Sequence, residues 1–269
     1  KQKNIKPIFG CELNVFDESK GIMKNMNVLV KNQKGLKNLY QIKECKMYKF
    51  DTHVHTAETS PCGKISAAET VRLYKEAGYS GICITDHYTK WLFESFRKTD
   101  WKEAVDRYLE GYRSAKEYGD RHGMDVLLGA EVLIDGTSND YLLFGLSEEI
   151  LYDYPRLYAY APEELSAFAK KHNLLLFQAH PFRSYVTAEN PLFLDGVEVF
   201  NGNPRHDSRN DLALRFAQES NLLMSGGSDF HQVEDVGRSG IMTDIRIKDA
   251  KTFVEVLKSG RLTVIRTEN

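Results

Sequence analysis

The stretch Tyr48-Lys49-Phe50-Asp51-Thr52-His53-Val54-His55 sets the interpretation of the whole chain. Its residues alternate in character, and side chains in a β-strand repeat every two residues, so Asp51, His53 and His55 are predicted to share one face. One aspartate and two histidines on one face are candidate metal ligands. A lone buried His is more often a hydrogen-bonded core residue and an Asp after a strand is often an N-cap, so the interpretation depends on companion motifs.

Four further apolar runs end in imidazole or carboxylate. They are Ile82-Cys83-Ile84-Thr85-Asp86-His87, Leu127-Leu128-Gly129-Ala130-Glu131, Leu174-Leu175-Leu176-Phe177-Gln178-Ala179-His180, and Leu222-Leu223-Met224-Ser225-Gly226-Gly227-Ser228 followed by Asp229-Phe230-His231. Five short strands with this ending predict a polynuclear metal site at the C-terminal mouth of a barrel. His122 and His172 follow helix-like patterns instead, and we expect both at helix C-termini, where their partial positive charge complements the helix dipole.

The composition suits a globular domain. A chain of 269 residues with 42% hydrophobic content can form one large α/β domain with a substantial core. A net charge of −2 gives no sign of a nucleic-acid or membrane surface. The sequence shows no apolar stretch of transmembrane length and no signal peptide. Cysteines 11, 45, 62 and 83 show no paired short spacing, which argues against a disulfide framework and predicts a cytoplasmic protein.

Residues 1–45 differ from the rest of the chain. They carry nine Lys against four acidic residues, a net charge of +5, so the remainder carries −7. Residues 8–15 share an apolar-Gly-x-Glu-apolar pattern with residues 128–134, and a second apolar run follows each, at 27–30 and at 141–144. We interpret residues 1–45 as a displaced or partial copy of a domain segment with an accessory role, and we predict that the complete domain spans 46–269.

From residue 46 onward strand and helix patterns alternate, which implies a parallel sheet covered by helices. Ligands at strand C-termini favour a closed barrel, with an open doubly wound sheet as the alternative. Strands are predicted at 47–54, 80–86, 125–134, 140–145, 174–180, 195–201, 222–228, 240–245 and 262–266. Helices are predicted at 67–77, 101–119, 162–171, 207–219 and 249–257. The run 174–177 lacks polar alternation, as expected of a strand buried on both faces.

The ordered set of motifs resembles the PHP superfamily, the polymerase and histidinol phosphatase domains, over residues 46–269. The resemblance implies an irregular (β/α)7 TIM-like barrel with the metal site at the C-terminal ends of the strands. It also implies metal-dependent phosphoesterase activity, as in most free-standing members. Separately, residues 6–12 and 28–40 resemble part of the PHP domain of bacterial DNA polymerase III α subunits. That match lacks the other metal motifs and occurs in the wrong order.

The resemblance also implies which residues hold each ion. The first ion would take His53, His55, Glu131 and Asp229. The second would take Glu131 as a bridging carboxylate, with His180 and His206, although His206 also fits a solvated surface position. The third would take His87, His231 and one ligand shortly after the His-x-His motif. Here the chain departs from the pattern, because residues 56–63 contain no His or Asp. Cys62 or Glu58 could replace that ligand, or the third site is weak.

This ligand set predicts the chemistry. Two to three divalent ions, Mn²⁺, Fe²⁺ or Zn²⁺, would lower the pKa of a bridging water and stabilise charge on a phosphoryl group. The catalytic residues would be Glu131, Asp229, His180 and Arg183. We expect Asp51 and Asp86 to orient His53 and His87 through the second ring nitrogen. Arg183 and Arg205 are candidates for phosphate binding, with an ordinary surface charge as the alternative for Arg205.

Three function classes follow. The leading hypothesis is a small-molecule phosphomonoesterase acting on histidinol phosphate, a nucleotide or a nucleoside bisphosphate. The second is a polymerase-associated module with a nuclease, proofreading or structural role, and the third is a non-catalytic metal-binding scaffold. The acidic balance after residue 45 argues against a nucleic-acid partner, because such grooves need clustered Lys and Arg. We therefore expect a small phosphorylated substrate and no membrane partner; the sequence does not determine the oligomeric state.

Overall fold

The structure is a computed structural model that describes residues 10–17, 22–29, 34, 46–96 and 99–267. The chain divides into two compact units, Lys1–Lys46 and Met47–Asn269. In the first unit, β1 (Gly10–Asp17) pairs antiparallel with β2 (Ile22–Leu29), and Glu12 lies opposite Asn27. The apolar-Gly-x-Glu segment thus forms one strand of a hairpin. Residues 8, 9 and 30 of the predicted pattern lie outside the described residues.

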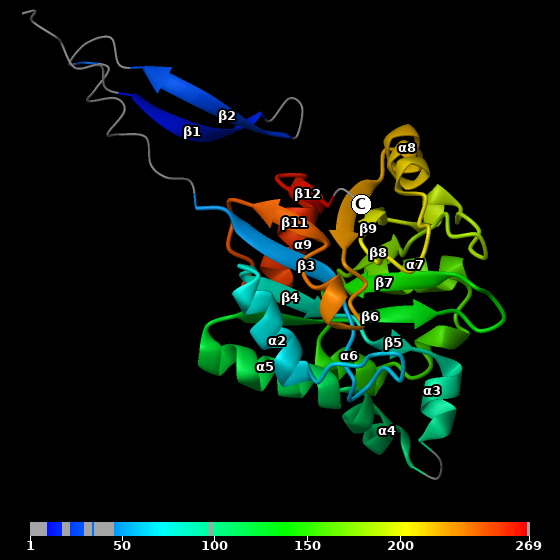
Figure 1. Cartoon of the computed structure of the whole chain (residues 1–269). Helices are drawn as coiled ribbons and strands as arrows, with labels where there is room; N and C mark the ends of the chain where they lie inside the picture. Colours follow the sequence, from blue (N-terminus) through cyan, green and yellow to red (C-terminus); the bar gives the residue numbers. More distant parts are fainter. Residues whose placement is uncertain (1–9, 18–21, 30–33, 35–45, 97–98, 268–269) are drawn as a thin grey trace, which may run out of the picture. The chain divides into compact units, whose positions relative to one another are not determined.

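The second unit is built on a ten-stranded sheet (Figure 1). Its main path runs β10 (Leu223–Gly227), β9 (Gly196–Asn201), β8 (Leu175–Gln178), β7 (Asp140–Phe144), β6 (Asp125–Leu133), β4 (Gly81–Ile84), β3 (Tyr48–Val54), β11 (Ser239–Thr243) and β12 (Thr263–Arg266). The short strand β5 (His87–Tyr88) pairs with β6. Strands β3, β4 and β6 are parallel, as are β8, β9 and β10.

Strand β10, at one end of this path, approaches β3 near the other end, so the sheet nearly closes into a barrel. The Thr52 hydroxyl on β3 donates to the Gly226 carbonyl on β10 over 3.1 Å, and Val54 bridges to Phe230. A Cβ on Gly227 would lie 2.2 Å from the Cβ of His53, so only glycine allows this approach. The nearly closed, barrel-shaped sheet confirms the predicted PHP-type fold.

The sheet is not wholly parallel. Strand β7 runs antiparallel to β6 and β8, and β11 runs antiparallel to β3 and β12. Residues 134–139 alone join β6 to β7. A parallel return needs a crossover of about a dozen residues or more, so this short connection permits only a hairpin. Glu131, near the end of β6, therefore lies beside the start of that hairpin loop.

The helices largely follow the sequence patterns. They are α2 (Ala67–Glu76), α3 (Lys90–Ser95), α4 (Trp101–Tyr108), α5 (Glu110–His122), α6 (Glu148–Asp153), α7 (Pro162–Lys171), α8 (Asn210–Ser220) and α9 (Ala250–Ser259). Three short 3-10 turns are Leu157–Ala159, Pro191–Phe193 and Val233–Asp235. The expectation for His122 and His172 is confirmed: His122 ends α5 and His172 caps α7. The short helices α3 and α6 were not predicted.

The predicted helix 101–119 is instead two helices that meet at Leu109. The hydroxyl of Thr59 accepts a hydrogen bond from the Gly111 amide at 3.1 Å and donates to the Tyr108 carbonyl at 3.0 Å. A side chain inserted into the backbone ladder is a recognised cause of helix interruption. Thr59 belongs to the loop that follows His55, so the break joins these helices to the candidate site.

The sheet is buried on both faces. On β8, Leu176 packs into one hydrophobic cluster with Leu143 and Val197, while Leu175 and Phe177 pack into a second cluster. This arrangement confirms the prediction from the unbroken apolar run at 174–177. Among the described residues, no helix is both long enough and apolar enough to span a bilayer.

Candidate metal centre

Glu131 lies at the centre of a buried cluster of imidazoles. Its Oε1 is 3.2 Å from the Nε2 atoms of both His53 and His180. Its Oε2 is 3.4 Å from His55 Nε2 and 2.8 Å from His87 Nδ1. These residues come from four separate segments, the ends of β3, β5, β6 and β8, so closure of the barrel brings the predicted ligands together.

A second carboxylate, Asp229, faces the same histidines just beyond β10. Its Oδ1 lies 3.5 Å from His53 Nε2 and 3.4 Å from His55 Nε2. The Nδ1 of His231 is also 3.4 Å from this oxygen. The four residues predicted for the first ion therefore converge on one point.

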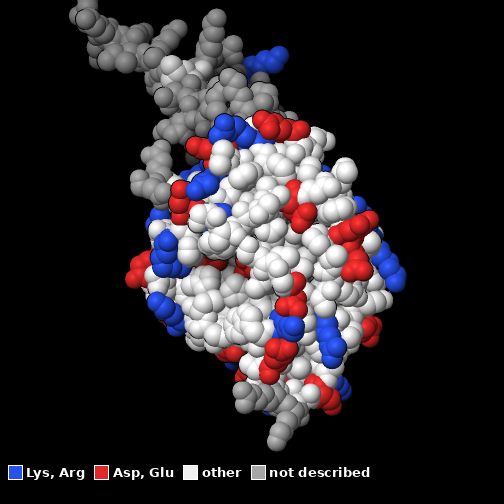
Figure 2. All heavy atoms as spheres, turned by 90° about the vertical axis from the view of Figure 1, so that its right-hand side faces the viewer, with Lys and Arg blue, Asp and Glu red and all other residues white. Residues whose placement is uncertain are grey.

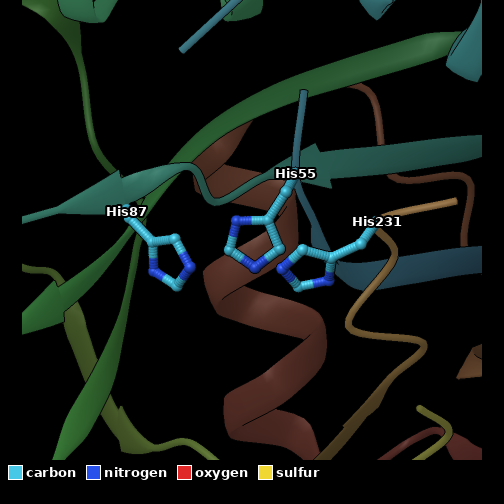
Figure 3. Close-up of side chains that lie close together, drawn as sticks. All are labelled: His55, His87 and His231. Atoms are coloured by element: carbon cyan, nitrogen blue, oxygen red, sulfur yellow. The ribbon is translucent and has the colours of Figure 1, made fainter. Parts of the chain in front are cut away.

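Three histidines of the cluster lie close together (Figure 3). The ring of His55 lies between those of His87 and His231, with centroid distances of 4.5 and 4.4 Å. The ligand atoms of these three residues fall within 4.8 Å of one another, as do those of His53, His55 and Glu131. A third group with this spacing adds Asp140 to His87 and Glu131.

Glu198 on β9 fixes the ring of His53. Its Oε1 is 2.9 Å from His53 Nδ1, and its Oε2 accepts from the His180 amide and from the Asn201 side chain. With Nδ1 donating to this carboxylate, Nε2 of His53 keeps its lone pair for a cation. Glu198 was not predicted, although a glutamate within the apolar run Gly196-Val197-Glu198-Val199 was the available signal.

Asp51 does not orient His53 through its ring, contrary to the sequence prediction. The Asp51 carboxylate instead accepts from the backbone amides of His53 and Ser228 and from the Tyr74 hydroxyl. It therefore fixes the backbone on either side of the barrel seam. The two-residue alternation correctly placed Asp51 on the same strand as His53. It could not show that Glu198, from another strand, would be the residue that contacts His53 Nδ1.

Asp86 also has a different partner from the one predicted. Its carboxylate accepts from the Thr56 amide and hydroxyl and from the Ser60 hydroxyl, each at 2.7 Å. The Ser60 hydroxyl gives its proton to Asp86, so its oxygen can only accept from His55 Nδ1, 3.3 Å away. This leaves Nε2 of His55 without hydrogen. Asp86 thus acts on His55 through Ser60, rather than on His87.

The donor set fits a cation. The Nε2 atoms of His53 and His55, both left with lone pairs, face each other at 3.1 Å. Glu131 Oε2 is buried and makes no hydrogen bond of acceptable geometry, despite the short distance to His87. Opposed lone pairs beside a buried carboxylate repel one another unless a proton or a metal cation lies between them. Mixed imidazole and carboxylate donors suit first-row divalent ions.

The charges in the centre are strongly coupled. Burial alone would raise the pKa of Glu131, yet His53 and His87 hold it well below its usual value. Burial alone would lower the pKa of His53, but Glu131, Glu198 and Asp229 raise it well above the ordinary value. The pKa of His55 is lowered well below that value by burial and by His231 and His87. The pKa values of His53 and His55 are therefore shifted in opposite directions.

Two ligand candidates have unusual backbone conformations. His180 has φ +30° and Asp229 has φ +51°, in the left-handed region that residues other than glycine rarely adopt. Such strain concentrates at functional sites, where surrounding contacts hold it. The turns after β8 and β10 thus direct the two side chains inward at the barrel mouth.

Arg183 and Arg205 both pair with carboxylates. Arg183 is buried, and its Nη2 lies 2.6 Å from Asp229 Oδ2 and 3.0 Å from Asn201 Oδ1. Arg205 makes a bidentate pair with Asp235 at 2.6 and 2.7 Å. Asp235 also accepts from the His231 amide. Arg183 therefore positions a candidate ligand directly, whereas Arg205 supports the segment that carries His231.

The remaining predicted ligands lie around this cluster. His206 is exposed on the loop after β9, outside the three close-spaced groups. Cys62 forms side-chain hydrogen bonds with His231 and His87. Burial raises the pKa of its thiol, but these contacts outweigh burial and lower the pKa to about 6. Glu58, the alternative to Cys62, accepts from the Ala67 amide at the start of α2. Asp140 is a further candidate ligand that was not predicted from the sequence. Burial, and to a lesser extent the negative charge of Glu131, raises the pKa of its carboxyl group to about 6.

Exposure to solvent differs within the centre. His53, His55 and Glu131 are at most 1% exposed, whereas His87 is 22% exposed and His231 and Asp140 are each 15% exposed.

The fold and the donor set define a barrel protein whose mouth can hold metal ions. Residues 51–229 match the PHP domain, and residues 207–262 match the PHP-associated C-terminal family. The chain belongs to the PHP family.

Several solved structures share the fold. One is a two-domain Bacteroides vulgatus protein that contains a predicted PHP-like metal-dependent phosphoesterase. It is 20% identical to this chain with a TM-score of 0.60, and the match covers 82% of this chain and 65% of that one. PsfC from Pseudomonas syringae is 18% identical, with TM-score 0.62, over 82% of this chain and 92% of its own. A lesion-specific endonuclease from Pyrococcus furiosus is 13% identical, with a TM-score of 0.50. That match covers 81% of this chain and 58% of the endonuclease. Comparison with curated proteins gives no match.

Proposed function

We propose that this protein hydrolyses small phosphate monoesters with the help of divalent metal ions. The observation that carries the proposal is the convergence of His53, His55 and His180 on Glu131, with Asp229 opposite. Divalent ions held there would supply Lewis acidity, which activates water and stabilises the charge on a phosphoryl group.

The residues of the chain would prepare the centre before substrate arrives. Glu198 and Ser60 fix the proton positions on His53 and His55, so both Nε2 atoms are ready to act as ligands. Arg183 holds Asp229 in place from behind. Groups fixed in this way need no rearrangement when charge develops in the reaction.

The surroundings favour a small substrate. A cavity of about 710 Å³ is lined by residues that include Arg205, His206 and Arg209. It shares Asn201 and Asn203 with the surroundings of Asp229. Its volume lies within the usual range for small-molecule sites, and its lining combines these basic side chains with Asp207 and Asp211.

The surface charge gives less support for nucleic acid. On the face in Figure 2, the described basic and acidic side chains are interspersed. Arg205 pairs with Asp235, and Lys90 pairs with Asp135 at 2.8 Å, so these cations are already neutralised. A polynucleotide groove needs clustered, available cations.

A phosphate-release screen tests the proposal. Metal-free protein would be reconstituted separately with Mn²⁺, Fe²⁺ and Zn²⁺ and assayed on matched phosphomonoesters and phosphodiesters. We expect release from monoesters that a chelator abolishes. No release from any ester would refute hydrolase activity, and preferential cleavage of diesters would favour a nuclease.

A further inference from the structure

Ser60-Pro61-Cys62-Gly63 forms a tight turn beside the partly exposed histidines. The Gly63 amide donates to the Ser60 carbonyl over 2.8 Å, and Pro61 occupies the second turn position, which its fixed φ favours. A Cβ on Gly63 would lie 2.7 Å from the Thr56 carbonyl oxygen, so a larger residue would disrupt the turn. The third position of the turn is Cys62.

The turn is tied to the segments that carry the two histidines. The Ser60 hydroxyl donates to Asp86, the residue before His87, and accepts from the His87 amide at 3.0 Å. On the other side, the Lys64 amide donates to the His231 carbonyl at 2.8 Å. The position of Cys62 is thus fixed relative to both histidines.

Four potential metal donors lie around this turn. The Cys62 thiol hydrogen-bonds to His87 and His231. His231 Nδ1 donates to the Asp229 carbonyl at 2.8 Å, which leaves its Nε2 without hydrogen. On the inner side, Glu131 Oε2 is buried, lacks a hydrogen bond and lies 2.8 Å from His87 Nδ1. One sulfur, two imidazoles and a carboxylate oxygen are the donor types and the number that zinc takes.

We propose that Cys62 is a ligand of a third metal ion, together with His87 and His231. The inference rests on the metal centre of the proposed function. Binding forms a sulfur–metal bond, and the thiol proton leaves to solvent without any change of oxidation state. The chain would thus place a soft thiolate where the family resemblance leads us to expect a His or Asp. A soft ligand favours Zn²⁺, Fe²⁺ or Co²⁺ over Mn²⁺ or Mg²⁺ at this position.

Cobalt spectroscopy tests the proposal without relying on turnover. The full chain would be reconstituted with Co²⁺, and its near-ultraviolet absorption recorded. We expect a thiolate-to-cobalt charge-transfer band that disappears in Cys62→Ser. Visible bands from cobalt at the other positions should remain. Cys83→Ala and the double variant Cys11→Ser/Cys45→Ser are matched controls and should keep the charge-transfer band.

Metal counting gives a second readout. Cys62→Ala should retain about one equivalent fewer than wild type, and Cys62→Asp should restore the count without the band. Cys62 is exposed, so these changes leave the packed core untouched. A band that persists in Cys62→Ser, or its absence from wild type carrying three equivalents of cobalt, would overturn the proposal. A protein with the band but without phosphate release would refute the proposed activity alone.

Discussion

Two hairpins in this chain share a sequence pattern and a backbone arrangement but differ in what surrounds them. Gly10-Cys11-Glu12 lies on β1 and Gly129-Ala130-Glu131 on β6, and each strand pairs antiparallel with the next. Glu131 is surrounded by histidines from three other segments of its unit. Residues 1–46 contain no histidine at all. The shared pattern therefore specifies a hairpin, whereas a metal centre also needs residues distant in sequence.

The largest expected effect comes from changing the two glutamates separately. Glu131→Gln removes a negative charge and one ligand from every ion it touches. We expect metal affinity to fall on the order of ten- to a hundredfold or more, and most of the activity to be lost. Glu12→Gln should change little, as substitutions away from such a site usually do. Metal content and phosphate release would be measured side by side, and equal losses would show that both hairpins contribute to the site.

Glu198 provides the next test, because it acts on His53 without being a predicted ligand. Glu198→Gln keeps the volume but can present an amide NH₂ to Nδ1, which favours the wrong tautomer of His53. We expect metal affinity to fall by about ten- to a hundredfold. Glu163→Gln, on the exposed start of α7, is the control. If equilibrium dialysis gave wild-type affinity for Glu198→Gln, the positioning role of Glu198 would be rejected.

A pH titration separates His53 from His55. Burial lowers the pKa of His53, but Glu131, Glu198 and Asp229 raise it well above its ordinary value, so a metal ion must compete with a proton for His53. The pKa of His55 is lowered, so it has none to release. Metal affinity should therefore fall as pH is lowered from about 8 to about 6. Affinity that is independent of pH, with no proton release on binding, would contradict this assignment.

The smallest effect is expected from removing the first hairpin. Deletion of residues 1–46 follows the boundary between the two units. The truncated protein should stay folded and keep its metal content, because all predicted ligands follow residue 50. Circular dichroism and metal analysis would check this. Insolubility or loss of metal would show that the hairpin is integral to the barrel.

The sequence predicted the strands and the convergence of their ends because both depend on local pattern. Alternation put His53 and His55 on one face, and barrel closure brought Glu131, His180 and Asp229 to them. The fold class was therefore within reach of the sequence.

The partners of those residues were not within reach. Glu198 lies 145 positions from His53, and their contact depends on barrel closure. Thr59 interrupts a helix whose own sequence reads as continuous. The pairing of Arg205 with Asp235 likewise joins two loops that no local pattern relates. Which side chains meet across a sheet depends on the three-dimensional path of the chain. The periodicity of apolar residues in the sequence does not encode that path.

The most direct test of the account is an anomalous-scattering crystal structure of the full chain grown with Mn²⁺ or Zn²⁺. We predict peaks within roughly 2.0–2.4 Å of His53 Nε2, His55 Nε2 and the carboxylate of Glu131. No peak should lie on the hairpin that carries Glu12. Peaks at Glu12, or an empty position beside Glu131 in crystals whose metal content is confirmed, would contradict the assignment of the centre to the second hairpin.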